Sequence, residues 1–115
     1  MTTITIRHNS ERSRFEVFDA DALIGQAAYV DDIAADQRIF YHTEINEEYG
    51  GRGLAGMLAA QALDETVAAG LTIVPVCPYI KKYLGKHSGY AANVVRPTPA
   101  HLRFLSASLA QRVRQ

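Results

Sequence analysis

Alternation of hydrophobic and polar side chains organises residues 1–45 of the chain. Ile4 and Ile6 stand between polar neighbours, and the same period of two recurs further along. Such alternation predicts half-buried strands, here over residues 3–7, 14–18, 23–30 and 38–45. The connections are short and polar, so the four strands are expected to form an antiparallel meander. Gly25 within the third run predicts a bulge or a close backbone approach.

The fourth of these runs decides which side chains share a face of the sheet. Strict alternation places one set on one face: Ile39, Tyr41, Thr43 and Ile45. It places the other set on the opposite face: Phe40, His42 and Glu44. The run then leads directly into a glycine-rich loop.

Helical spacing replaces alternation after that loop. Over residues 54–69 one stripe is apolar or small, with Ala55, Leu58, Ala59, Ala62 and Thr66 along it. Gly70 is expected just past the C-terminus of this helix. Residues 71–77 then form a short apolar strand, in which Pro75 predicts that ladder pairing stops. A strand, a helix and a strand in succession imply a right-handed crossover with the fourth and fifth strands parallel.

The last third of the chain is expected to be mainly helical. Pro78 suits the first turn of a helix over residues 79–84, which Gly85 weakens or stops. Residues 86–90 are expected to form a loop. A proline after Thr98 begins a final amphipathic helix, marked by Leu102, Leu105, Leu109 and Val113. That helix is expected to pack on its own sheet or on another subunit. The fold class is therefore α/β (α+β), with a mixed sheet and C-terminal helices, in one domain spanning residues 1–115.

The glycine-rich loop, residues 48–55, carries the first candidate chemistry. Gly50, Gly51 and Gly53 allow sharp turns and close approach of a ligand to the backbone. The first amides of the following helix lack intrahelical partners, and the helix dipole favours an anion there. Spacing alone leaves two readings open, a phosphate cradle and a simple turn. A dinucleotide-binding loop would lie earlier in a parallel sheet, and an ATP-type loop would carry lysine where Leu54 stands.

Composition narrows the classes of protein further. The chain has 115 residues, 48% of them hydrophobic and 21% charged, with a formal net charge of zero. Zero net charge gives no electrostatic case for nucleic acid or an anionic membrane as partner. Cys77 is the single cysteine, so there is no internal disulfide framework and no thiolate-based metal site is expected. No apolar run approaches the roughly 20 residues that span a bilayer, and no secretory signal precedes residue 3, so a cytoplasmic location is expected.

From Thr43 to His87 the sequence resembles the GNAT superfamily of acyl-CoA-dependent N-acetyltransferases, in particular its minimal short-form members. The resemblance rests on the strand end at residues 43–45, the loop at 49–55, the helix positions Leu58, Ala62 and Leu63, and the segments 74–83 and 86–87. The superfamily loop begins with Gln or Arg, but this chain has Glu48 there. Gly51 and Gly53 match. The resemblance implies a GNAT-like mixed sheet in which the fourth and fifth strands splay apart.

The resemblance also implies the donor, acetyl-CoA, without a metal. Backbone amides of the loop would hold the coenzyme A pyrophosphate, from Gly50, Gly51, Arg52, Gly53, Leu54 and Ala55, next to Tyr49. Arg52 would add positive charge. The pantetheine arm would lie between the splayed strands and pair with backbone near Ile45. A phosphate of the adenosine end would meet Lys82, Lys86 and His87, although solvated side chains are the plain alternative for these cations.

Acetyl transfer to an amine needs a base for the ammonium and a donor for the departing thiolate. Glu44 is the expected base, directly or through water, and His42 could share the role. Tyr83 or Tyr79 could protonate the coenzyme A sulfur. Cys77 at a strand end could carry the acetyl group in a two-step route, and a small buried apolar residue is the alternative.

Two functions from different classes remain open on the sequence. One is an N-acetyltransferase acting on a primary amine, either a small molecule or a protein. The other is a non-catalytic coenzyme A-binding module or sensor, because little chain remains to build an amine pocket. Asp31, Asp32 and Asp36 could attract a cationic acceptor or form a solvated connection. A monomer or weak homodimer is expected.

Overall fold

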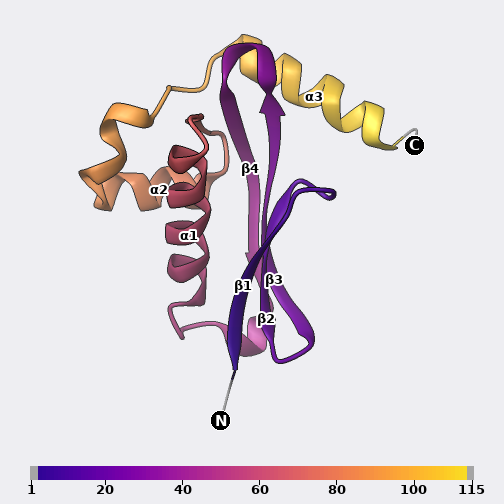
Figure 1. Ribbon diagram of the computed structural model, residues 1–115, viewed down its shortest axis with the longest axis vertical. Helices are drawn as coiled ribbons and strands as arrows, with labels where there is room; N and C mark the ends of the chain where they lie inside the picture. Colours follow the sequence, from indigo (N-terminus) through magenta and orange to yellow (C-terminus); the bar gives the residue numbers. More distant parts are fainter. Residues whose placement is uncertain (1–2, 114–115) are drawn as a thin grey trace.

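A computed structural model of the protein describes residues 3–113. Its strands form one mixed sheet in the order β1-β2-β3-β4-β5 (Figure 1). Their bounds are β1 Ile4–Asn9, β2 Arg14–Asp19, β3 Ala22–Asp32, β4 Gln37–Ile45 and β5 Thr72–Pro75. Strands β1 to β4 pair antiparallel with their neighbours, and β5 pairs parallel with β4. The meander and the parallel fifth strand predicted from the sequence are confirmed.

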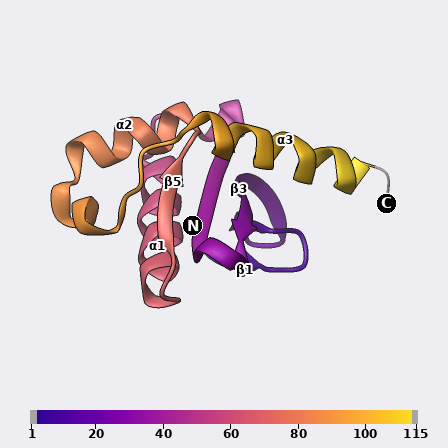
Figure 2. The same cartoon turned by 90° about the horizontal axis from the view of Figure 1, so that it is seen from above.

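Three α-helices accompany the sheet: α1 Leu54–Ala68, α2 Pro78–Lys86 and α3 Pro99–Val113. Short 3-10 turns lie at Ile33–Ala35, Glu47–Tyr49 and Ser88–Asn93. Seen from above, α1 and α2 lie on one side of the sheet and α3 lies on the other (Figure 2). We call the sheet face toward α1 and α2 the near face, and the opposite one the far face. None of the described helices is both long and apolar enough to cross a membrane.

The near face holds the larger part of the core. Side chains from β2 to β5 meet the buried stripe of α1, which comprises Leu54, Leu58, Ala59, Ala62, Leu63 and Thr66. The alanines keep the helix close to the strands. Gly70 follows the helix at φ +79°, the left-handed conformation expected of a residue that ends a helix. The amphipathic pattern read from the sequence is therefore realised in α1.

The C-terminal helix packs on its own sheet. Leu105 is buried on the far face against Val30, Ile39 and Val74, and Leu109 packs beside it. Leu102 and Val113 belong to the same predicted stripe but are 49% and 87% exposed. The helix therefore covers the upper part of the far face only.

Two glycines behave differently from each other. A Cβ on Gly25 would lie 2.5 Å from Ile45 Cδ1 and 2.8 Å from the Glu44 carbonyl oxygen, so β3 and β4 approach closely there as predicted. The β2–β3 register also shifts beside it. Gly85, in contrast, does not stop α2, which continues to Lys86.

The side chains of β4 are distributed between the two faces of the sheet differently from the prediction. Its register against β3 shifts so that Ala28 pairs with His42 while Tyr29 pairs with Phe40, which leaves Tyr41 as an extra residue. A bulge of this kind resets the alternation. Phe40 packs into the near-face core, whereas His42 and Glu44 lie on the far face, so the prediction that the three share a face is wrong. Likewise, Thr43 and Ile45 lie on the opposite face from Ile39 and Tyr41.

Strands β4 and β5 separate immediately after Phe40. The parallel ladder ends where Phe40 pairs with Pro75, and the Phe40 carbonyl oxygen then accepts hydrogen bonds from both the Val76 and Cys77 amides, at 3.0 and 2.8 Å. Proline has no amide hydrogen to continue a ladder. Beyond this point β4 runs on to Ile45 without a strand on its β5 side within residues 3–113. The splay implied by the resemblance is present.

The acidic connection between β3 and β4 has structural partners. Asp31 accepts hydrogen bonds from the buried Arg38 guanidinium at 2.8 and 2.9 Å, and Asp32 accepts one from the Ala35 amide at 3.3 Å. These contacts favour the solvated-connection interpretation over a docking site for a cationic acceptor.

Candidate functional site

The glycine-rich loop joins the end of β4 to the start of α1 with an exposed backbone. Gly51 and Gly53 have φ angles of +79° and +74°, and a Cβ at either position would meet nothing within 4 Å. The requirement for glycine here is therefore conformational, since L side chains rarely adopt a left-handed backbone. Gly53 occupies the N-cap position of α1 and supplies no side-chain cap.

The amides of residues 51–56 have no hydrogen-bond acceptor within the described part of the chain. The series starts one residue later than the sequence suggested, because the Gly50 amide already donates to the Glu47 carbonyl at 3.0 Å. It ends at Met57, whose amide donates to the Gly53 carbonyl at 3.1 Å. Unpartnered amides at a helix N-terminus, with the positive end of the helix dipole behind them, suit an anion such as phosphate.

Tyr49 anchors this loop to the sheet. Its hydroxyl donates a hydrogen bond of 2.5 Å to Asp19 at the end of β2, and that bond raises the pKa of Tyr49. The Arg52 guanidinium lies 5.0 Å from the centre of the Tyr49 ring, a cation–π contact. Arg52 therefore stays beside the loop amides, while the Glu48 side chain is exposed.

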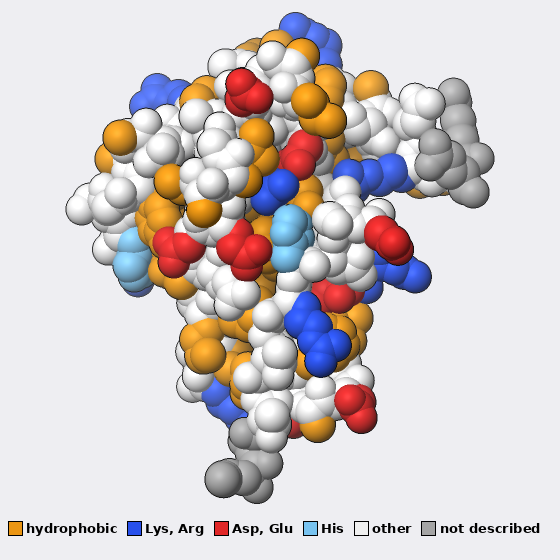
Figure 3. Space-filling view, in the orientation of Figure 1, with side chains coloured by type: hydrophobic (Ala, Val, Ile, Leu, Met, Phe, Trp, Pro, Cys, Tyr) orange, Lys and Arg blue, Asp and Glu red, His pale blue; other side chains and the backbone are white. Residues whose placement is uncertain are grey.

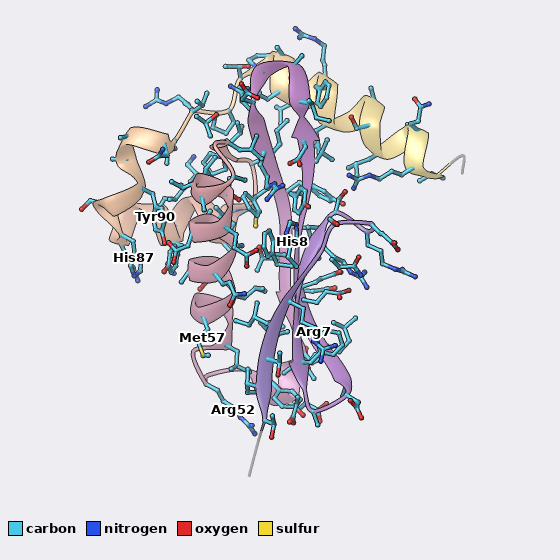
Figure 4. All side chains as sticks on the ribbon, in the orientation of Figure 1. Arg7, His8, Arg52, Met57, His87 and Tyr90 are labelled. Carbon is cyan, nitrogen blue, oxygen red and sulfur yellow. The ribbon has the colours of Figure 1, made fainter. Side chains whose placement is uncertain are left out.

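A cavity of about 520 Å³ opens between α1 and α2. One wall is α1, where the small Gly56 and Ala60 flank Met57. The other wall comes from α2 and its end: Tyr79, Lys82, Tyr83, Lys86 and His87. Arg52 and Met57 lie at the lower end of α1, and His87 lies at the outer edge of the molecule (Figure 4). Hydrophobic surface gathers beside the histidine at the left edge of Figure 3, over the α1–α2 pair.

An aromatic series lines the α2 wall of this cavity. The Tyr83 and His87 rings are stacked 3.9 Å apart, and Tyr79 lies one helical turn before Tyr83. Burial is the main cause that raises the pKa of Tyr79 and of Tyr83, so both hydroxyls stay protonated at neutral pH. Tyr90, in the turn after α2, donates a 2.6 Å hydrogen bond from its hydroxyl to Asp64 of α1.

Cys77 lies at the closed end of the gap between β4 and β5. It is buried, and its Sγ lies 3.4 Å from Thr43 Oγ1 on the near face of β4. Pro78 follows it as the first residue of α2, so the thiol stands at a helix N-terminus. The sulfur is therefore next to the place where the two strands part.

His42 and Glu44 form a polar pair on the far face. His42 Nε2 lies 3.3 Å from Glu44 Oε2, and the two side chains are 53% and 55% exposed. Gln26 of β3 donates a 2.8 Å hydrogen bond to Glu44 Oε1. That bond, followed by the contact with His42, lowers the pKa of Glu44, which is therefore ionised at neutral pH.

The structure thus divides the predicted site residues between four places: the glycine loop, the cavity, the near side of the gap and the far face. The loop residues surround the unpartnered amides, although the Leu54 side chain is buried and only its backbone is available. Lys82, Lys86, His87 and Tyr83 share the cavity. Cys77 and Glu44 lie on opposite faces of β4, so the sheet separates them.

Several residues at these sites were not predicted from the sequence. Gly56 and Ala60 are spaced one helical turn apart, and this pair of small residues was the signal for a cavity wall on α1. Gln26 gave no signal, because its contact with Glu44 depends on the β3–β4 register. Within the part of the chain that the structure describes, no group of three or more His, Cys, Asp or Glu side chains gathers around a common centre.

Comparisons with a family profile, with two relatives and with a solved structure agree with one another. Residues 14–94 match the sequence profile of a family described as GCN5-related N-acetyl-transferase. Protein NATD1 of Mus musculus is 35% identical over 86 residues, covering 70% of this chain and 74% of that protein. Protein NATD1 of Gallus gallus is 32% identical over 107 residues, covering 89% and 84%. The NMR structure of a Staphylococcus aureus protein described as GCN5-like superposes with a TM-score of 0.62 at 21% identity, covering 88% of this chain and 97% of that one, and supports the fold.

Proposed function

The chain belongs to the GCN5-related N-acetyltransferase family, and we propose that it moves an acetyl group from acetyl-CoA to a primary amine. One observation carries the proposal. Among residues 3–113, the amides of residues 51–56 have no partner, and they follow a strand, β4, whose last residues have no partner strand on one side. This combination suits a ligand with an anionic end and an amide-bearing arm.

The near side of the molecule offers groups whose chemistry suits coenzyme A. The loop amides and Arg52 would take the pyrophosphate. Strand residues alternate in the direction of their backbone groups, and the Asn46 amide donates to Ile24 of β3 at 2.8 Å. The amide and carbonyl of Ile45, and those of Thr43, therefore face the open side, where they would pair with the pantetheine arm. Lys82 and Lys86 would meet a phosphate of the adenosine end.

The residues at the gap supply the remaining chemistry, once coenzyme A brings the acetyl thioester. Glu44 is the carboxylate that would draw the proton from an acceptor ammonium on the far face, directly or through a relay. Tyr83 or Tyr79, both protonated, would donate to the departing sulfur from the near face. Cys77 lies close enough to the gap for a two-step route, in which its thiolate would carry the acetyl group before the amine takes it.

A second function has its own supporting observation. Below α3 the far face around His42 and Glu44 is open, with both side chains more than half exposed. A chain with so little wall around an acceptor site could bind acetyl-CoA as a sensor without efficient transfer. Enzyme and sensor differ in turnover, not in coenzyme binding.

An assay of free thiol release separates the two. Purified protein with acetyl-CoA would be offered spermidine, a lysine-containing peptide, glucosamine and tyramine. Amine-dependent thiol release is expected, together with a mass increase of the amine by one acetyl group. Tight acetyl-CoA binding without release for any amine would support the sensor. Without amine, an acetyl adduct on Cys77 in the mass spectrum, absent from Cys77→Ala, would indicate the two-step route.

A further inference from the structure

A second cavity lies on the other side of α2 from the one proposed for coenzyme A. Its volume is about 410 Å³, which falls within the range of about 300–1,000 Å³ typical of small-molecule sites. It opens between α2 and residues 94–97, the segment that runs beside β5 on its way to α3 (Figure 2). The proposed acetyl transfer makes no use of this space.

Two prolines explain why the chain leaves the space open. The segment after the last 3-10 turn begins to pair with β5 as a parallel strand. Ile73 bridges to Val94, and the Val95 amide donates to the Ile73 carbonyl at 2.8 Å. Two residues further along β5 stands Pro75, and two residues beyond Val95 stands Pro97. Neither proline has an amide hydrogen, so the ladder stops, the two segments part, and α2 forms the third wall of the cavity.

Positive charge borders this cavity. Lys81 contributes from α2 and Arg96 from the other wall, and no acidic side chain of the described residues lines the space. Neither cation forms a salt bridge with a carboxylate among residues 3–113. The sequence explains the lack of acids, because all twelve Asp and Glu residues lie in residues 1–65. Seven of the twelve Lys and Arg residues lie in residues 66–115, so the neutral chain has a strongly basic second half.

The rest of the cavity wall is apolar. Leu84, Ala91 and Val94 face the space together with the two prolines. Gly85 leaves room on the α2 side, because a Cβ added there meets no atom within 4 Å. Such walls favour a ligand with an apolar body, since burial removes its hydrocarbon surface from water. A bare inorganic anion would lose hydration against them and gain only two exposed cations in return.

We propose that this cavity is a second ligand site, which binds a small organic carboxylate with an apolar body. The carboxylate would accept hydrogen bonds from the Lys81 ammonium and from the Arg96 guanidinium, whose planar fork matches the two oxygens. The body would lie between Leu84 and Val94. The site is separate from the coenzyme cavity, because Lys81 lines one cavity and the next residue, Lys82, lines the other. The inference goes beyond acetyl transfer and does not depend on it.

Three matched probes test the chemistry of the ligand by titration calorimetry. They are 4-phenylbutyrate, its uncharged amide 4-phenylbutyramide, and acetate, which has the charge without the body. Phenylbutyrate should bind at one site, and about tenfold more tightly than the amide, because two exposed ion pairs distinguish them. Acetate should bind more weakly than phenylbutyrate. Saturating coenzyme A should not displace phenylbutyrate.

Two adjacent lysines of α2 provide a matched pair of variants. Lys81→Ala should weaken phenylbutyrate binding by about threefold, and Lys81→Ala combined with Arg96→Ala by about tenfold, to the affinity of the amide. Lys82→Ala should leave phenylbutyrate affinity unchanged. Gly85→Leu should fill the cavity and abolish binding. Its Tm should not fall, because leucine is a better helix former than glycine and the added side chain enters open space.

The outcomes separate the parts of the inference. No binding of phenylbutyrate would overturn it outright, and equal affinity for phenylbutyrate and its amide would overturn the assignment of a carboxylate. Equal losses in Lys81→Ala and Lys82→Ala, or displacement of phenylbutyrate by coenzyme A, would assign the probe to the coenzyme cavity and so overturn the second site. Absence of amine-dependent thiol release would overturn the proposed acetyl transfer alone, since these titrations involve no turnover.

Discussion

Replacing Gly51 by aspartate tests the phosphate cradle most directly. Gly51 has a φ of +79° and open space around an added Cβ, so any L side chain there costs strain but meets no clash. The strain of a left-handed residue is about 1–2 kcal/mol. For a domain of this size it corresponds to a fall in Tm of about 4–8 °C. Gly51→Ala carries this strain alone.

Aspartate adds a negative charge to the same strain. Two unit charges about 5 Å apart repel by about 3 kcal/mol at an effective dielectric constant of about 20, and salt screening of an exposed loop reduces this. A further loss of affinity of about tenfold to a hundredfold is therefore expected for acetyl-CoA, relative to Gly51→Ala. The loss should shrink as ionic strength rises.

Gly70 offers the matched control, because its φ is also +79° and its added Cβ also meets nothing within 4 Å. It lies at the other end of α1, away from the loop. Gly70→Asp should lower Tm at least as much as Gly51→Asp, since an acidic residue is unfavourable at a helix C-terminus. Of the two aspartate variants, titration calorimetry should find normal acetyl-CoA affinity for Gly70→Asp and weakened affinity for Gly51→Asp. Equal affinity in Gly51→Asp and Gly51→Ala would refute the placement of phosphate at these amides.

Three further predictions address the cavity, the sheet and the response to pH. Replacing Lys82 and Lys86 together by alanine should weaken binding of coenzyme A more than that of 3′-dephospho-coenzyme A, as measured by calorimetry. Gly25→Ala should reduce the free energy of unfolding by about 1–3 kcal/mol in urea titrations, because the new methyl group collides with the Ile45 side chain and with β4 backbone. Burial, and then Arg38, lower the pKa of His8 from 6.5, so protonation favours the unfolded chain and stability should fall as pH drops below about 6.5.

Each of these has a control within the chain. Lys81→Ala removes a lysine that faces a different cavity and should bind both coenzymes normally. Gly85→Ala, inside α2 with no atom within 4 Å of the added Cβ, should be neutral or stabilising where Gly25→Ala is not. His8→Gln should remove its share of the acid destabilisation, and an unchanged pH dependence would contradict the role given to burial. Equal weakening for the two coenzymes would argue against the lysine–phosphate contact.

Much of this architecture could be predicted from the sequence because local patterns determine it. Alternation predicted the meander, helical spacing predicted α1, and Pro75 marked where β5 leaves the ladder. The glycine loop could be predicted for the same reason, since left-handed residues and an uncapped helix start are local properties. Contacts and exposures that depend on the register between distant segments could not be predicted from the sequence. The Gln26 contact with Glu44 and the exposure of Leu102 both belong to this class.

The bulge at Tyr41 shows why one such feature matters for the candidate site. With strict alternation, His42 and Glu44 would project to the same side as Phe40, which is fully buried under α1. A carboxylate and an imidazole there would compete with the apolar core, and burial would penalise the charge. The extra residue lets one strand place Phe40 in the core and, two residues later, a polar pair on the open face. The same displacement leaves Thr43 and Cys77 on the near side of the gap. In the proposed reaction, acetyl-CoA and the acceptor amine would therefore reach the gap from opposite faces of the sheet, which is an arrangement that direct transfer needs.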